Sequence, residues 1–199
     1  MKFFKDNSYD IVKLFINQIG ITIFSLVLYT AVGFIEDAAL FTKIIVLVSV
    51  FSSIFYLSLL YTAMWDLGAK DIIRIDGGKD TRVHLKGVKM SLIANIPNFA
   101  LALFTVIMMS IHLSSGSEGA YTVFGVFNLL LRFLNSMYLG IIQGVFSFLP
   151  ENSDVSFLWQ SVGYLVMPLI SVIVTHLGYE AGIKNFRIFK ALTEKKGKK

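Results

Sequence analysis

The chain has 199 residues, of which 55% are hydrophobic and only 16% are charged, and its formal net charge is +5. With a mean hydropathy of +0.70, this composition excludes an ordinary soluble domain and predicts an all-α polytopic membrane protein with a single membrane domain over residues 1–199. The cations lie beside apolar segments, so we expect anionic lipid head groups rather than nucleic acid as their partners. The chain contains no cysteine, which excludes disulfides and thiolate metal sites.

Four apolar stretches are long enough to cross the bilayer as helices, since about 20 apolar residues cross roughly 30 Å of hydrocarbon. The expected spans are residues 14–35, 39–65, 90–113 and 156–180. The first has no convincing cleavage site after it, so we interpret it as a retained transmembrane helix. In the third, the step Asn95-Ile96-Pro97-Asn98 should kink the helix and free backbone carbonyls.

A fifth segment, residues 123–149, has the length of a span but is amphipathic. Its polar residues recur every three or four positions, which places them on one face of a helix whose other face is apolar. They are Asn128, Arg132, Asn135, Ser136, Gln143 and Ser147.

The distribution of Lys and Arg predicts the topology. Cations gather in the N-terminal flank, in a loop expected at residues 66–89 and in a tail expected at residues 181–199, so we expect all three in the cytoplasm. Residues 114–122 and 150–155 carry acids but no cation and should lie outside. Segment 123–149 then has to enter and leave on the outer side, as an amphipathic helix or a re-entrant hairpin broken near residues 135–140. The alternative is five crossings with an external basic tail.

The ends of two predicted spans carry the same pattern of aromatic, acid, x, Gly, x, Lys, Asp or Asn. An aromatic ring suits the head-group level, Gly can end a helix, and Lys can pair with the acid one turn earlier. The repeat indicates either two similar interfacial caps or a duplicated unit that docks a partner. The candidate docking residues are Trp65, Asp66, Gly68, Lys70, Tyr179, Glu180, Gly182 and Lys184.

Residues of about 60–100 combine the first of these motifs, the Gly77-Gly78 turn and the run Lys86-Gly-Val-Lys-Met-Ser-Leu-Ile-Ala-Asn-Ile-Pro-Asn98. This stretch resembles small multi-pass membrane proteins of low-GC Gram-positive bacteria. The resemblance implies location in a cell membrane and no particular activity.

No catalytic constellation stands out. The three histidines are far apart and lack partners at ligand spacing, and no nucleophile motif accompanies the serines, so we expect no metal, no cofactor and no catalytic residue. His176 lies one turn before Glu180 and can share a proton with it.

The polar residues inside the expected spans are the best functional lead, because an arginine in hydrocarbon costs several kcal/mol unless it faces protein, water or the interface. They can line a cavity for a small polar or anionic substrate or hold a lipid head group. Alternatively, Arg132 only extends to the surface and the amides join helices. The candidates are Arg132, Asn128, Asn135, Gln143, Asn95, Asn98 and His176.

These features favour a transport-related protein of the cell membrane with both termini cytoplasmic, either a small permease or the membrane subunit of a larger transporter. If it conducts, it should form a homo-oligomer, because four helices enclose little volume. The alternative is a non-transporting interaction or assembly factor that docks a membrane or cytoplasmic partner subunit. A lipid-modifying enzyme is the least favoured function.

Overall fold

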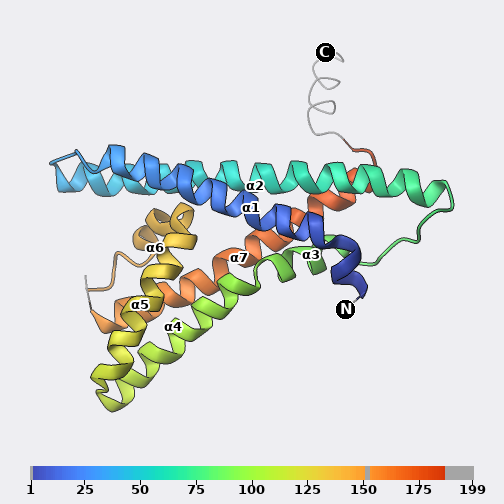
Figure 1. Cartoon of the computed structure of the whole chain (residues 1–199). Coiled ribbons are helices and arrows are strands. Elements are labelled where there is room, and N and C mark those ends of the chain that lie inside the picture. The colour runs from blue at the N-terminus through green and yellow to red at the C-terminus, as the bar shows by residue number, and fades with distance from the viewer. Residues whose placement is uncertain (1, 151–152, 187–199) are drawn as a thin grey trace.

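The computed structural model describes residues 2–150 and 153–186, and every regular element in those residues is a helix. In chain order the elements are α1 (Lys2–Val32), α2 (Ala38–Asp76), α3 (Lys86–Ala94), α4 (Ile96–Ser115), α5 (Glu118–Leu134), the 3₁₀ turn η1 (Ser136–Tyr138), α6 (Leu139–Val145) and α7 (Asp154–Ile183). Within these residues α1, α2, α4 and α7 are long and apolar enough to span a membrane. The predicted all-α polytopic fold is therefore confirmed (Figure 1).

The long helices bury small and polar residues and expose large apolar ones. On α2, Ser49, Ser52 and Gly68 are buried, whereas Leu47 and Phe51 are exposed. This is the reverse of a soluble helix and is expected where lipid replaces water, because small side chains let helices approach closely and apolar ones face acyl chains.

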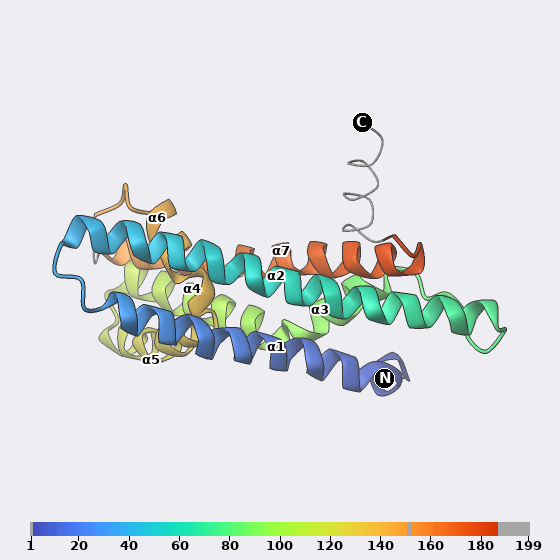
Figure 2. The ribbon, with the colours of Figure 1, turned by 90° about the horizontal axis from the view of Figure 1, so that it is seen from above.

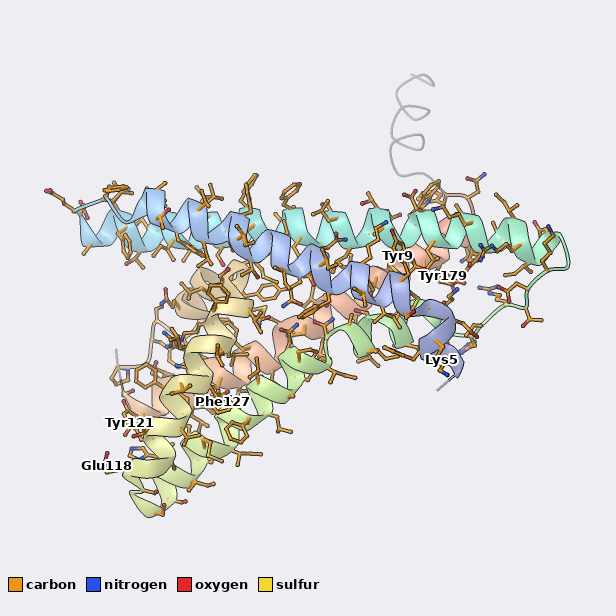
Figure 3. The ribbon with its side chains drawn as sticks, viewed as in Figure 1. Lys5, Tyr9, Glu118, Tyr121, Phe127 and Tyr179 are labelled. Carbon is orange, nitrogen blue, oxygen red and sulfur yellow. The ribbon has the colours of Figure 1, made fainter. Side chains whose placement is uncertain are left out.

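The bundle has two chemically different ends (Figure 3). The start of α1, the loop 77–85 and the end of α7 lie together at what we call the basic end, near Lys5 and Tyr179. The turn 33–37, the end of α4 and the starts of α5 and α7 lie at the opposite, acidic end. The carboxylates there are Glu36, Asp37, Glu118 and Asp154.

The bent pair formed by α5 and η1–α6 begins and ends at the acidic end. His112 Nε2 near the end of α4 lies 3.4 Å from Asp154 Oδ2 at the start of α7. The chain between them therefore returns to the end from which it departs, which is the arrangement expected of a re-entrant segment. The two limbs meet at 85° next to Asn135, within the predicted break. Figure 2 shows the pair passing beneath α1 and α2.

The loop predicted at residues 66–89 is much shorter than expected. α2 continues to Asp76 and ends where Gly78 adopts φ +68°, and α3 begins at Lys86. A helix of 39 residues is about 58 Å long, which exceeds the hydrocarbon thickness. Ile72 and Ile75 pack against the core and support its last turns, so the helix outlasts its apolar stretch.

Other helices also extend beyond their predicted apolar stretches. α1 begins at Lys2 and not near residue 14, and α7 extends to Ile183. The predicted third span is two helices, because Asn95 leaves the helical path and Pro97 occupies the first turn of α4. This is the kink that the Asn-x-Pro-Asn step predicts. Residues 187–199 of the predicted tail lie outside the described residues.

Candidate functional site

The break between α5 and α6 frees backbone carbonyls in the interior of the bundle, where each must find a donor. The Met137 carbonyl finds two donors on α2: Ser49 Oγ donates to it at 2.6 Å and Ser53 Oγ at 3.0 Å. Tyr29 of α1 donates its hydroxyl to the Ser136 carbonyl at 3.1 Å. The broken backbone is thus held by side chains of two spans.

A third carbonyl at the break connects it to a group of amides. The Leu134 carbonyl accepts hydrogen bonds from Thr22 Oγ1 at 2.8 Å and from Gln18 Nε2 at 3.1 Å. Gln18 lies on α1 and is itself buried. Side chains of α1 therefore bond both the backbone at the break and the amides beneath it.

Gln18, Asn95, Asn98 and Asn135 form what we call the amide cluster. Asn98 is its centre: Nδ2 donates to Gln18 Oε1 at 2.8 Å and to Asn95 Oδ1 at 2.9 Å. Its Oδ1 accepts from Gln18 Nε2 at 3.0 Å and from Asn135 Nδ2 at 3.2 Å. Asn98 and Asn135 are 0% exposed. The cluster is uncharged and offers both donors and acceptors, which suits polar groups without a net charge.

The cluster joins elements that are far apart in the sequence. Gln18 comes from α1, Asn98 from α4 and Asn135 from the α5–η1 break, and Asn95 Nδ2 reaches α7 by donating to Ser171 Oγ at 3.2 Å. Close packing holds the break in place, because a Cβ on Gly140 of α6 would collide with the carbonyl oxygen of Ile45 on α2. Two further buried hydroxyls, Ser52 Oγ and Tyr138 OH, have no hydrogen-bond partner among residues 2–150 and 153–186.

Arg132 lies apart from the amide cluster, in the last turn of α5. Its Nη2 donates to Gln160 Oε1 of α7 at 2.7 Å, and Gln160 Nε2 in turn donates to Ser156 Oγ at 3.0 Å. The guanidinium carbon lies 5.7 Å from the centre of the Phe157 ring. Its Nε is buried without a partner, and no carboxylate of the described residues forms an ion pair with it.

A buried ion pair stands at the basic end. Lys86 Nζ lies 2.7 Å from Asp71 Oδ2, and the Tyr179 hydroxyl donates to the same oxygen at 2.9 Å. Both charged residues are less than 10% exposed. An exposed pair, Arg82 with Glu180 at 2.7 Å, lies nearby. These contacts join the start of α3, the end of α2 and the end of α7.

The two repeated motifs pack against each other. A Cβ on Gly68 would collide with the carbonyl oxygen of Tyr179, and a Cβ on Gly182 would collide with that of Trp65. The two glycines also face one another: the built Cβ of Gly68 lies 3.1 Å from Gly182 Cα, and the reverse distance is 3.0 Å. In each motif, the glycine therefore leaves room for the backbone carbonyl of the aromatic residue in the other motif. Such a reciprocal contact has local two-fold symmetry.

Several expectations about these motifs need correction. Gly68 lies inside α2 and does not end it, because the helix continues for two more turns. Lys70 and Lys184 are exposed and form no ion pair among the described residues, since Glu180 pairs with Arg82 instead. Trp65 Nε1 donates to the Phe186 carbonyl at 2.8 Å. Asp66 is exposed, and docking of a partner by these residues stays a prediction.

The structure brings together only part of the predicted polar set. Asn95, Asn98 and Asn135 meet in the amide cluster. Asn128 is half-buried and its side chain forms no hydrogen bond to another described residue, and Gln143 is exposed. The single polar stripe expected over residues 123–149 does not form, because the 85° bend turns its two halves in different directions. Within the part of the chain that the structure describes, His176 Nδ1 is buried without a hydrogen-bond partner, and no hydrogen bond joins it to Glu180.

Several residues that complete these sites were not among the candidates predicted from the sequence. Ser49, Ser52 and Ser53 recur at the spacing of one helix face, and this was the available signal for the α2 donors. Gln160, Asp71 and Lys86 gave no comparable signal, because their partners are distant in the sequence.

The fold and its interior define the class of this protein: a polytopic α-helical membrane protein with a sharply bent helix pair over an uncharged polar cluster. Comparison with known protein families, with curated proteins and with solved structures finds no match. The function therefore has to be argued from the site itself.

Proposed function

We propose that this is a transport-related protein of the cell membrane, a small permease or the membrane subunit of a larger transporter, and that the amide cluster is the polar site on its pathway. The observation that carries the proposal is Asn98, which is fully buried inside the bundle and bonds three other amides at the break of a helix. Transporters commonly build their sites where discontinuous helices expose backbone groups near the middle of the bilayer. Uncharged amides fit a small polar solute.

The observed arrangement corresponds to a closed state, because the amides bond each other. Transport requires α5 and α6 to move relative to α1, so that bonds such as Gln18 to Asn98 and Gln18 to Leu134 are exchanged for bonds to the solute. Interhelical hydrogen bonds in membranes are worth about 0.6 kcal/mol each on average. An exchange of a few of them is therefore compatible with motion on a functional timescale.

We also propose that the basic end faces the cytoplasm. Lys5, Arg74, Lys79, Arg82 and Lys89 are exposed there, and cytoplasmic segments of membrane proteins carry the excess of Lys and Arg. The re-entrant pair then lies in the outer half of the membrane, where it can admit a solute from outside.

The test compares two serines of α7 in this cysteine-free chain. Ser171 Oγ bonds the amide cluster through Asn95, whereas Ser161 Oγ bonds only the Phe157 carbonyl, and both serines are 0% exposed. A pathway predicts that Ser171→Cys reacts with a small water-soluble thiol reagent in energised cells at least about tenfold faster than Ser161→Cys, because motion of the cluster admits water. Reaction is measured by the mass shift of the purified protein.

Ser161 is a demanding control because it lies nearer the acidic end of α7 than Ser171. Static burial alone would make it equally or more reactive. Equal protection of both cysteines under all conditions would contradict a pathway through the amide cluster. It would favour the alternative of an interaction or assembly factor whose polar interior only holds the helices together.

A further inference from the structure

Among residues 2–150 and 153–186, no carboxylate forms an ion pair with Arg132. At the acidic end Asp154 lies next to His112, and Glu118 is the first residue of α5, fourteen positions away and thus about 21 Å along the helix. The nearest polar partner is the neutral amide of Gln160. A cation in the membrane without a counter-ion costs several kcal/mol. Binding of an anion from outside the chain would remove this cost.

The local geometry leaves donors for such an anion. Guanidinium has five N–H groups, of which the structure engages one with Gln160. Phe157 covers one face of the group and fixes its orientation. Arg132 is partly exposed, and planar guanidinium matches the paired oxygens of a phosphate.

The surroundings of Arg132 indicate that the anion comes from the bilayer. Its neighbours on α5, Leu130 and Phe133, are 46% and 52% exposed, so the site is bordered by side chains that face lipid. Trp159, next to Gln160, is 49% exposed, and exposed tryptophans favour the head-group level. Gln160 lies six residues after Asp154, about 9 Å along α7, which is within reach of lipid phosphates for a side chain of this length.

We propose that Arg132, oriented by Gln160 and Phe157, binds the phosphate of an anionic phospholipid in the leaflet at the acidic end. This site is separate from the amide cluster and does not depend on the proposed transport function. The lipid anchors the α5–α7 contact and supplies the missing negative charge.

The experiment measures lipid retention by native mass spectrometry of the delipidated full chain in detergent, titrated with phosphatidylglycerol or phosphatidylcholine of the same acyl chains. The wild type should retain phosphatidylglycerol at least about tenfold more tightly. Arg132→Gln should reduce this preference to within about twofold of phosphatidylcholine. The matched control is Lys43→Gln, which removes an exposed cation near the start of α2, at the same end of the bundle, and should keep the preference.

Several results would overturn the proposal. They are equal retention of both lipids by the wild type, an unchanged preference in Arg132→Gln, or equal losses in the two variants, which would reflect general attraction to positive charge. Inorganic phosphate distinguishes the source: if it raises the melting temperature only when Arg132 is present, and phosphatidylglycerol is not retained, the ligand is a soluble anion and not a lipid. If Arg132→Gln does not fold, Gln160→Ala takes its place, because loss of the amide that orients the guanidinium should also weaken the preference for phosphatidylglycerol.

Discussion

The ion pairs of this protein differ in how deeply they are buried. Lys86 and Asp71 form a buried pair completed by the Tyr179 hydroxyl, whereas Arg82 and Glu180 form an exposed one. Removing one member of a buried pair leaves an uncompensated charge in a medium of low polarity. Exposed pairs are screened by water and contribute little.

We therefore predict that Lys86→Met lowers the free energy of unfolding by about 3–5 kcal/mol, while Arg82→Met lowers it by less than about 1 kcal/mol. Unfolding by sodium dodecyl sulfate in mixed micelles, followed by circular dichroism, measures both. In the double variant Lys86→Met with Asp71→Asn, most of the loss should be recovered, because no buried charge remains. A double variant as unstable as Lys86→Met would contradict this account of the pair.

At this scale the sequence predicted some residues of the site and missed others for a clear reason. Asn95, Asn98 and Asn135 were identified because an amide inside an apolar stretch is conspicuous on its own. Lys86 and Asp71 were assigned to an aqueous loop, where charges are ordinary. Burial of that pair depends on α2 continuing past its apolar residues and on α3 folding back onto α7, which a local pattern does not contain.

Among the elements, the contact between α2 and α7 has a symmetry that explains the repeated motif. Both helices run from the acidic to the basic end (Figure 1), and Gly68 and Gly182 occupy equivalent places in their contact. α1 with α2 forms one antiparallel hairpin, and α4 with α7 forms another. The two helices of the first hairpin are joined by the short turn 33–37, whereas those of the second are joined by the bent pair α5–α6.

The reciprocal contact predicts that Gly182→Ala and Gly68→Ala destabilise the protein to a similar extent, each by about 1–3 kcal/mol, because a methyl group forces the two backbones apart. Gly20→Ala in α1 is the matched control, since no atom lies within 4 Å of its built Cβ. It should be neutral or stabilising by up to about 1 kcal/mol. Thermal unfolding in detergent measures all three. A loss in Gly20→Ala equal to the others would show that helix glycines matter here for another reason.

The sequence predicted the existence and order of the spans, and the position of the break, better than the packing between them. Apolar length and the Asn-x-Pro-Asn step act locally, so they predict a span or a kink without further information. The packing of the two motifs against each other was not predicted, since the repeat was interpreted either as two similar interfacial caps or as a duplicated unit that docks a partner. Only the arrangement in space decides which surface each glycine faces.

For the whole molecule, the central expectation is that both ends of the bent pair emerge on the same side of the membrane. Single cysteines at Ser114, in the last turn of α4, and at Ser153, just before α7, should react with a membrane-impermeant maleimide on intact cells. His84→Cys, in the exposed loop 77–85, should react only after the cells are opened. The physical reason is that the four spans separate the acidic end from the basic end.

The pattern of labelling also tests the orientation. Labelling of His84→Cys alone on intact cells would show that the basic end faces outward. This result would contradict the orientation predicted from the positions of Lys and Arg. Labelling of Ser114→Cys without Ser153→Cys would mean that the bent pair crosses the bilayer.

The way in which α1 and α2 hold the helix break has a consequence for assembly. Among the described residues, Thr22, Ser49 and Ser53 find their distant partners at residues 134–141, and chains are synthesised from the N-terminus. The first hairpin therefore enters the membrane with hydroxyls that can bond only their own helix until the bent pair arrives. The bent pair is thus the late component that completes the interior, and a nascent chain stopped before it would leave a hydroxyl-lined face of the first hairpin against lipid.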